Sequence, residues 1–278
     1  MCSGPIRKMK TSLEEQVKYE LHLGDCDPIV MSDYVGKGIR LTWQKQILCV
    51  NCGSPTNKSF AQGFCYPCFS TSPAMSECII RPELCQAHLG KGIRDAEWDQ
   101  EHHNCPHFVY LALTDAVKVG VTRFNQIPTR WIDQGAWKAI RLAEVPYRQL
   151  AGEIEIALKE YVTDKTNWRN MLRDQRKEGV DLVDEKYDLI EYLPDELQDF
   201  VSDDDEVTEI NYPVIAYPEK VKSVSFDKTE VVGGLLQGIR GQYLIFADGT
   251  VINMRKFGGY VVQFEEAAIA APAPTLFG

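Results

Sequence analysis

Apolar and polar residues alternate near both ends of the chain, as they do in β-strands, whereas the centre of the chain mixes strand-like and helical spacing. Residues 17–23 and 38–48 follow this alternation, which is typical of half-buried strands. Together they predict an antiparallel β unit near the N-terminus. Neither segment carries a group of residues that indicates chemistry.

The C-terminal alternation covers residues 234–246, 250–254 and 260–264. Asp248-Gly249, between the first two segments, is a strong hairpin turn signal, so we expect a small antiparallel β domain here. Its aromatic residues alternate within the strands, which favours packing in a core over stacking on nucleic-acid bases. These residues are Tyr243, Phe246, Tyr260 and Phe264.

In the centre of the chain, strand-like and helical spacing follow one another. The predicted elements are a strand at 108–113, a strand at 117–122, a helix at 128–135, a strand at 137–145 and a helix at about 148–162. The first two strands form a hairpin through a short turn. Pro128 suits the start of the first helix and Gly135 its end. Asp164 or Thr166 is expected to cap one more helix.

This β-β-α-β-α-α order resembles the GIY-YIG nuclease superfamily, in particular a zinc-containing bacterial branch of it. Val109-Tyr110 stands for the Ile-Tyr of the first family motif, and Val119-Gly120 for the Ile-Gly of the second. Arg130 looks like the catalytic arginine of the family, and Glu155 looks like its metal-binding glutamate. Asn167 is similar to an asparagine found downstream.

The resemblance implies a phosphodiester hydrolase that acts on DNA or RNA with a divalent cation. In such an enzyme Glu155 would hold Mg²⁺ or Mn²⁺, and Tyr110 would position or deprotonate the attacking water. Arg130 would pair with the scissile phosphate through its planar guanidinium. Lys118 would hydrogen-bond to phosphate, or act as a base if burial lowers its pKa.

Three positions depart from the family pattern. Phe108 replaces the first glycine, Lys118 the second tyrosine, and Gln134 a histidine one turn after the arginine. Two hypotheses from different classes therefore remain. One is a GIY-YIG-type endonuclease, and the other is a catalytically silent nucleic-acid-binding or protein-interaction module with the same fold.

Each catalytic residue also has a structural interpretation. Tyr110 would then be a core aromatic residue with a satisfied hydroxyl group. Arg130 and Glu155 would form an ion pair between facing helices. Glu153 would point inward in place of Glu155, because helical periodicity alone does not fix the face that Glu155 occupies.

Four cysteines form a spaced pair of C-x-x-C turns. Cys49 and Cys52 are separated from Cys65 and Cys68 by 12 residues that contain glycine and proline. This spacing is typical of a tetrahedral zinc site, and the two turns resemble a zinc ribbon or treble clef. Four thiolates leave no position for water, so we expect a structural site. The alternative is a redox-active dithiol.

A second Cys/His group follows. Cys78, Cys85 and His88 would supply three zinc ligands, and Cys105 or His103 the fourth. Alternatively, the two cysteines are buried apolar residues and the histidines lie on a loop. A last alternative is a catalytic metal held by His102, His103 and His107.

Charge and composition indicate where the acidic residues lie and which cellular compartment to expect. The net charge is −10, but residues 1–150 carry 17 Lys or Arg against 15 Asp or Glu, so the acidity belongs to residues 151–278. The run Asp203–Glu206 is either a solvated linker or a shield for a basic face. No apolar run approaches the ~20 residues that span a bilayer, and six of nine cysteines have metal-type spacing. We therefore expect a cytoplasmic protein.

The sequence thus predicts an α+β protein of several parts. They are an N-terminal β unit (1–48), a zinc-binding module (49–107), a GIY-YIG-like domain (108–178), an acidic helical linker (179–220), a C-terminal β domain (221–264) and a disordered tail (265–278).

Overall fold

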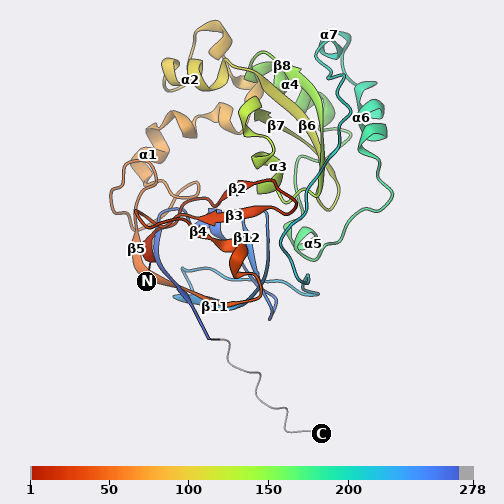
Figure 1. Cartoon of the computed structure of the whole chain (residues 1–278). Coiled ribbons are helices and arrows are strands. Elements are labelled where there is room, and N and C mark those ends of the chain that lie inside the picture. The colour runs from red at the N-terminus through yellow and green to blue at the C-terminus, as the bar shows by residue number, and fades with distance from the viewer. Residues whose placement is uncertain (1, 269–278) are drawn as a thin grey trace.

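A seven-stranded sheet joins strands from both ends of the chain (Figure 1). The structure, a computed structural model, describes residues 2–268. In sheet order the strands are β1 (Cys2–Pro5), β14 (Tyr260–Glu266), β5 (Gly38–Ile47), β11 (Val231–Arg240), β12 (Tyr243–Phe246), β13 (Thr250–Asn253) and β10 (Lys222–Ser223). β5 lies antiparallel to both β14 and β11. The α+β class is confirmed, and the two terminal β units share one sheet.

The N-terminal strands pair differently from the expectation. β3 (Lys18–Leu21) lies between β2 (Lys10–Ser12) and β4 (Ile29–Val30) in a separate three-stranded sheet, whereas β5 pairs with the C-terminal strands. Alternation identifies the residues that face a core but not the partner strand. Loop-closure entropy also rises only slowly with loop length, so distant strands can pair.

The predicted strand at 234–246 is two strands in the structure. β11 ends at Arg240 and β12 begins at Tyr243, and Gly241 between them has a φ of +61°, where a side chain is disfavoured. The expected core packing of the aromatic residues is confirmed for Phe246, which is buried with Phe264. Tyr260 is in the same core, and Tyr243 stacks on Trp168.

The central domain has the predicted order of elements. Its sheet consists of β7 (Val117–Arg123), β6 (His107–Leu113), β8 (Lys138–Val145) and β9 (Thr208–Glu209), in that order. Its helices are α3 (Thr129–Asp133), α4 (Arg148–Leu158) and α5 (Trp168–Leu172). Asn167, rather than Asp164 or Thr166, caps α5, since its side chain accepts hydrogen bonds from the amides of Arg169 and Asn170, the second and third residues of the helix. Every residue of β6 is buried, as expected for a strand covered on both faces.

The acidic segment folds onto the central sheet. It contains α6 (Leu182–Ile190) and α7 (Asp195–Gln198), and β9 joins the sheet edge. Lys186 is fully buried, and its amine donates to the carbonyl oxygens of Ser202 and Asp204 and pairs with Asp205 at 2.8 Å. Arg141 pairs with Asp204. Carboxylates of the acidic run therefore pair with cations of α6 and β8.

The cysteine module lies on the opposite side of the central sheet from α6 and α7 (Figure 1). It contains α1 (Tyr66–Thr71) and α2 (Ala96–His103). Short 3₁₀ helices complete the chain: η1 (Met31–Tyr34), η2 (Pro73–Met75), η3 (Glu77–Ile79), η4 (Pro82–Leu84), η5 (Ala87–Leu89), η6 (Phe124–Gln126) and η7 (Met254–Phe257). None of the helices within residues 2–268 is long and apolar enough to cross a membrane.

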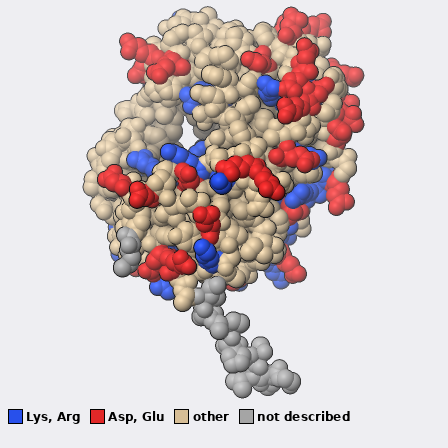
Figure 2. Space-filling view, in the orientation of Figure 1, with Lys and Arg blue, Asp and Glu red and all other residues tan. Residues whose placement is uncertain are grey.

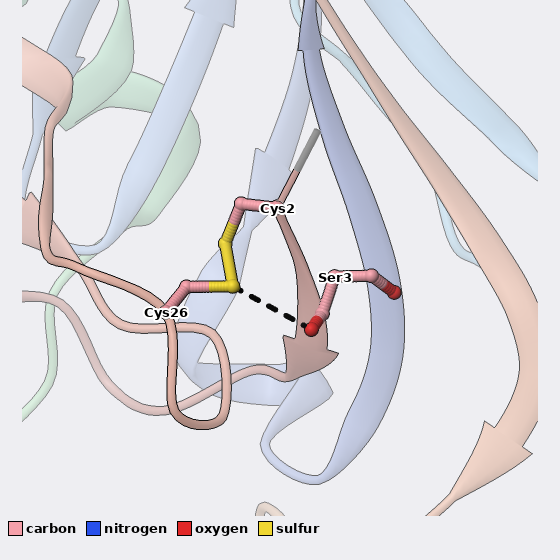
Figure 3. Close-up of a disulfide and its surroundings, with 3 residues drawn as sticks. All are labelled: Cys2, Ser3 and Cys26. Carbon is pink, nitrogen blue, oxygen red and sulfur yellow. Dashed lines mark hydrogen bonds between the residues drawn. A yellow bond between two sulfur atoms is a disulfide. The ribbon is translucent and has the colours of Figure 1, made fainter.

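A disulfide links Cys2 of β1 to Cys26, 24 residues away (Figure 3). The Cys26 sulfur also lies 3.6 Å from the carbonyl oxygen of Ser3. Neither cysteine belongs to the six with metal-type spacing, and this bond was not predicted from the sequence. Of the predicted tail, Glu265 and Glu266 belong to β14, and residues 269–278 lie outside the described residues.

Arg240 joins the seven-stranded sheet to the central domain. Its side chain is fully buried and donates to the carbonyl oxygens of Gly135 and Met171, each at 3.0 Å. It also pairs with Asp174 at 2.7 Å. A buried cation that loses its partners is costly, and so is a buried carbonyl that loses its donor. This arginine therefore fixes the relative position of the two sheets.

Replacing Arg240 tests whether this side chain holds the two sheets together. We expect Arg240→Ala to lower the free energy of unfolding by about 2–4 kcal/mol, since it leaves the Gly135 carbonyl without a donor and empties a fully buried site. Urea denaturation followed by circular dichroism measures this change. The exposed Arg40→Ala, which breaks a surface ion pair with Glu265, should cost under about 1 kcal/mol. Equal effects of the two substitutions would contradict the assignment.

Candidate functional site

A cleft of about 490 Å³ lies between the central sheet and the cysteine module. β7 supplies its floor from Lys118 to Arg123, α3 and α4 supply further walls, and the module contributes residues around Ile79 and His103. In the space-filling view, Lys and Arg side chains gather beside a hollow in this face of the molecule (Figure 2).

Three of the four predicted catalytic residues line this cleft: Lys118, Arg130 and Glu155. The fourth, Tyr110, is fully buried on β6, directly opposite Gly120 of β7. Its hydroxyl lies so close to Gly120 that any Cβ at that position would overlap it. Glycine is thus required there because the tyrosine side chain crosses over the backbone of β7 toward the cleft floor.

Gln134 holds the Tyr110 hydroxyl. The Gln134 amide donates to the hydroxyl oxygen at 2.6 Å, so the residue that stands in place of a family histidine contacts the predicted catalytic tyrosine. Burial raises the pKa of Tyr110, while the nearby Arg130 guanidinium opposes that rise. The hydroxyl is consequently protonated at neutral pH and can donate a hydrogen bond.

Lys118 is a buried amine at the edge of the cleft. It donates to the carbonyl oxygen of Asp164 at 3.3 Å and to the hydroxyl of Thr166 at 3.4 Å. Burial, and then the charge of Arg130, lower the pKa of Lys118 to about 8. The amine is therefore mostly protonated at neutral pH, and a fraction is available as a base.

Glu155 points into the cleft, whereas Glu153 accepts a hydrogen bond from Gln149 on the same helix. Burial raises the pKa of Glu155, and Lys159 opposes the rise. The Lys159 amine lies 3.4 Å from the Glu155 carboxylate and 3.7 Å from that of Asp164. Within residues 2–268, Arg130 and Glu155 form no ion pair with each other, so that structural interpretation is not supported.

Cations outnumber carboxylates around the cleft. Among the described residues, the lining cations are Lys8, Lys118, Arg123, Arg130, Arg148, Lys159 and Arg255, and the lining acids are Asp133, Glu155 and Asp164. Arg148 is held by the carbonyl oxygens of Cys78 and Ile79, each at 2.9 Å, and burial lowers its pKa. Anchoring by neutral oxygens leaves the positive charge available to an anion.

Sequence patterns did not identify five of these cations, Lys8, Arg123, Arg148, Lys159 and Arg255. They come from a loop after β1, from the end of β7, from the start and the C-cap of α4, and from η7. Isolated cations at such distant positions carry no spacing signal. The hydrogen bond from Gln134 was also missed, although its position one turn after Arg130 was noted. Asn167 caps α5 and does not line the cleft.

The first cysteine group is assembled as predicted and is positioned to bind a metal. The sulfur atoms of Cys49, Cys52, Cys65 and Cys68 lie within 4.8 Å of one another. The Cys52 and Cys65 sulfurs are 3.8 Å apart, close to the separation of about 3.8 Å that two Zn–S bonds of 2.3 Å give in a tetrahedron. Burial raises the pKa of Cys49, but backbone amide donors outweigh this effect and bring it to about 6. A thiolate is thus favoured where a metal would sit.

The second group brings together Cys78, Cys85 and His103, all buried. Of the two expected fourth ligands, His103 belongs to the group. The Cys105 thiol instead donates to the carbonyl oxygen of His102, at 3.5 Å. The ring of His88 stacks on Tyr147, with centroids 4.3 Å apart. His88 is thus outside the group, because η5 places its ring against the residue that precedes α4.

The remaining histidines do not form a catalytic group of three. His102 stacks on Trp98, and a ring nitrogen of His107 lies 2.7 Å from the carbonyl oxygen of Cys105. Burial lowers the pKa of His107 to about 3, so this ring is neutral. Only His103 of the three belongs to a metal-type group among the described residues.

Comparison with known proteins gives one match. No curated protein and no solved structure matches the chain. A family model described as "Protein of unknown function (DUF2797)" matches residues 36–262. The matched segment runs from just before β5 into β14, and it includes both cysteine groups and most of the cleft. The chain therefore belongs to the DUF2797 family of proteins of unknown function.

Proposed function

We propose that the cleft binds a phosphodiester of DNA or RNA and that Tyr110, Lys118, Arg130 and Glu155 hydrolyse it with a divalent cation. The observation that carries this proposal is the convergence of three of these side chains on one cation-rich cleft, with the tyrosine hydroxyl beneath its floor. A phosphate is the anion that best fits such a cleft, since guanidinium and ammonium groups bind its oxygens strongly.

The charge distribution supports an anionic ligand. The protein has a net charge of −10, yet its cleft has more cations than acids. Lys118 and Arg148 are anchored mainly by uncharged oxygens, so their charge is not neutralised locally. Bringing a phosphate among these groups would relieve their mutual repulsion.

Each proposed catalytic residue has a role that its surroundings suit. Arg130 would pair with the scissile phosphate. Tyr110, kept protonated by burial and held by Gln134, would orient the attacking water. Lys118, whose pKa is about 8, would accept the proton of that water in its neutral form, or bind phosphate in its charged form.

The acids of the cleft fit a hydrated divalent cation. Glu155 and Asp164 both contact the amine of Lys159, and the approach of the two carboxylates to one cation supports a cation site at this point. Mg²⁺ and Mn²⁺ bind through one or two carboxylates, together with phosphate and water. Such an ion would stabilise negative charge on the leaving oxygen.

Zinc at the first cysteine group belongs to the same proposal. Its ligands are four thiolates, so the metal would be structural and would hold the two C-x-x-C turns together.

A second candidate function is nucleic-acid binding without cleavage. The pairing of Lys159 with Glu155 favours it, since this amine already occupies the carboxylate that the cation would need. Lys118 in place of a tyrosine also adds a phosphate-binding cation and removes a hydroxyl group from the expected catalytic set. A cleavage assay with wild-type protein distinguishes the two candidates.

Arg130→Ala and Glu155→Gln test the hydrolytic proposal. Each should lower the rate of cleavage of labelled DNA or RNA in Mg²⁺ or Mn²⁺ by about 100- to 1,000-fold, because each removes a group that stabilises transition-state charge. Arg40→Ala and Glu153→Gln are matched controls outside the cleft and should cleave normally. Cleavage that survives both cleft substitutions would refute these roles. If wild type binds without cutting, the second candidate holds.

The pH dependence of binding tests Lys118. Its charge is present below its pKa of about 8 and is lost above it, so the affinity for a short fluorescent single-stranded DNA should fall as the pH rises above 8. In Lys118→Arg, the guanidinium stays charged, and the affinity should hold to about pH 10. Fluorescence anisotropy at constant salt measures both profiles. Superimposable profiles would show that Lys118 does not contact the phosphate.

Metal analysis tests the first cysteine group. Purified protein should contain zinc, and Cys49→Ser should lose the ion of that site and unfold at a lower temperature, because metal binding contributes to folding. Inductively coupled plasma mass spectrometry and thermal melting give the two values. Zinc content that is unchanged in Cys49→Ser would exclude the assignment.

A further inference from the structure

Four buried side chains of metal-ligand type converge in the wall of the cleft. Cys78, Cys85 and His103 form the second group already described, and Asp99 lies beside it on α2, one turn before the histidine. All four side chains are nearly inaccessible to solvent. We propose that these residues hold a second, zinc-type metal ion, with Asp99 as the fourth ligand, and that this ion keeps the cleft wall in place.

Three ligand atoms, those of Cys78, Cys85 and His103, lie within 4.8 Å of one another, and Asp99 lies next to this set through its contact with His103. The Cys78 sulfur lies 3.7 Å from Nδ1 of His103, and an oxygen of Asp99 lies 3.1 Å from the same nitrogen. Zinc bonds of about 2.3 Å to sulfur and 2.0–2.2 Å to nitrogen or oxygen place their ligand atoms about 3.3–3.8 Å apart. Asp99 lies outside the 4.8 Å group, so its carboxylate would have to move toward the sulfurs on metal binding to become the fourth ligand.

Asp99 has a feature that a metal explains. One carboxylate oxygen accepts a hydrogen bond from the backbone amide of Ile93 at 2.9 Å, but the other, Oδ1, is buried without a hydrogen-bond partner. Its polar neighbour is Nδ1 of His103, which lies 3.1 Å away without hydrogen-bond geometry, and a bound cation would satisfy both atoms. Oδ1 is also the oxygen that faces His103. The alternative without a metal is an ion pair between Asp99 and a protonated His103.

The proposed ion is coupled to the cleft through the loop between its two cysteines. Ile79, Ile80 and Pro82 of this loop line the cleft, and so does His103. Arg148 of α4 donates to the carbonyl oxygens of Cys78 and Ile79. The same helix carries Glu155, and its Gly152 packs so closely on the loop that a Cβ would overlap the backbone of Glu83.

Loss of the metal would therefore release the loop, and with it the anchor of Arg148 and the packing surface of α4. This coupling to ligand binding rests on the function proposed above, whereas the metal site itself does not. Its experiment accordingly measures metal and loop protection, without nucleic acid.

Metal content is measured on the full-length protein and on single variants. Wild type should carry one metal at each cysteine group. Asp99→Ala and His103→Ala should each lose one of these two ions, while His88→Ala and the exposed Glu101→Ala on the same helix keep both. A wild-type protein with a single metal, or an Asp99→Ala protein with both, would overturn the proposal. Loss of one ion in His88→Ala would also overturn it, because His88 would then be the ligand.

Two further measurements separate ligation from folding. Asp99→Cys provides a thiolate that can bind zinc, so it should recover the lost ion, and failure to recover it would count against Asp99 as a ligand. In Asp99→Ala, amide hydrogen exchange should lose protection in residues 76–85 but not in β5. Unchanged protection in residues 76–85 would refute the coupling of the metal to the cleft wall.

Discussion

The cations that line the cleft repel one another, and the fold must offset this repulsion. Like charges held together destabilise a fold unless other groups offset them. For two of them the offset comes from carbonyl and hydroxyl oxygens: those of Asp164 and Thr166 hold Lys118, and those of Cys78 and Ile79 hold Arg148. Lys8 and Lys159 pair with carboxylates instead. Lowered pKa values at Lys118 and Arg148 reflect the same burial. The arrangement leaves a cleft with more cations than acids in a protein of net charge −10, which supports the proposal of an anionic ligand.

The cysteine module and the sheets hold these cations in position. The loop from Cys78 to Cys85 presents the carbonyls that bind Arg148, so the second cysteine group and the cleft are parts of one unit. On the other side, buried Arg240 joins β11 to the segments after α3 and α5. The long pairing of β5 with β14 and β11 closes the chain ends into one sheet. Each contact is between segments far apart in sequence.

The separation of these contacting segments along the chain explains which features could be predicted from the sequence. Three predicted features depend on local periodicity and short spacings, and the structure contains all of them: the hairpin of β6 and β7, the helix that carries Arg130 and the four-cysteine group. The partners of β5 and the break at Gly241 depend on tertiary packing, which periodicity does not encode. The same holds for Arg148, whose hydrogen-bond partner Cys78 lies far away in the sequence. It also holds for Asp99, because its burial cannot be predicted from the residue type alone.

The location of a bound phosphate analogue tests the central claim most directly. A crystal of the protein soaked in tungstate, whose anomalous signal identifies its position, should show the ion within hydrogen-bond distance of the Arg130 guanidinium and the Lys118 amine. Such a result would establish that the cations of the cleft are arranged for a tetrahedral oxyanion. Tungstate bound only at other surfaces, with no anion between Arg130 and Lys118, would contradict the account.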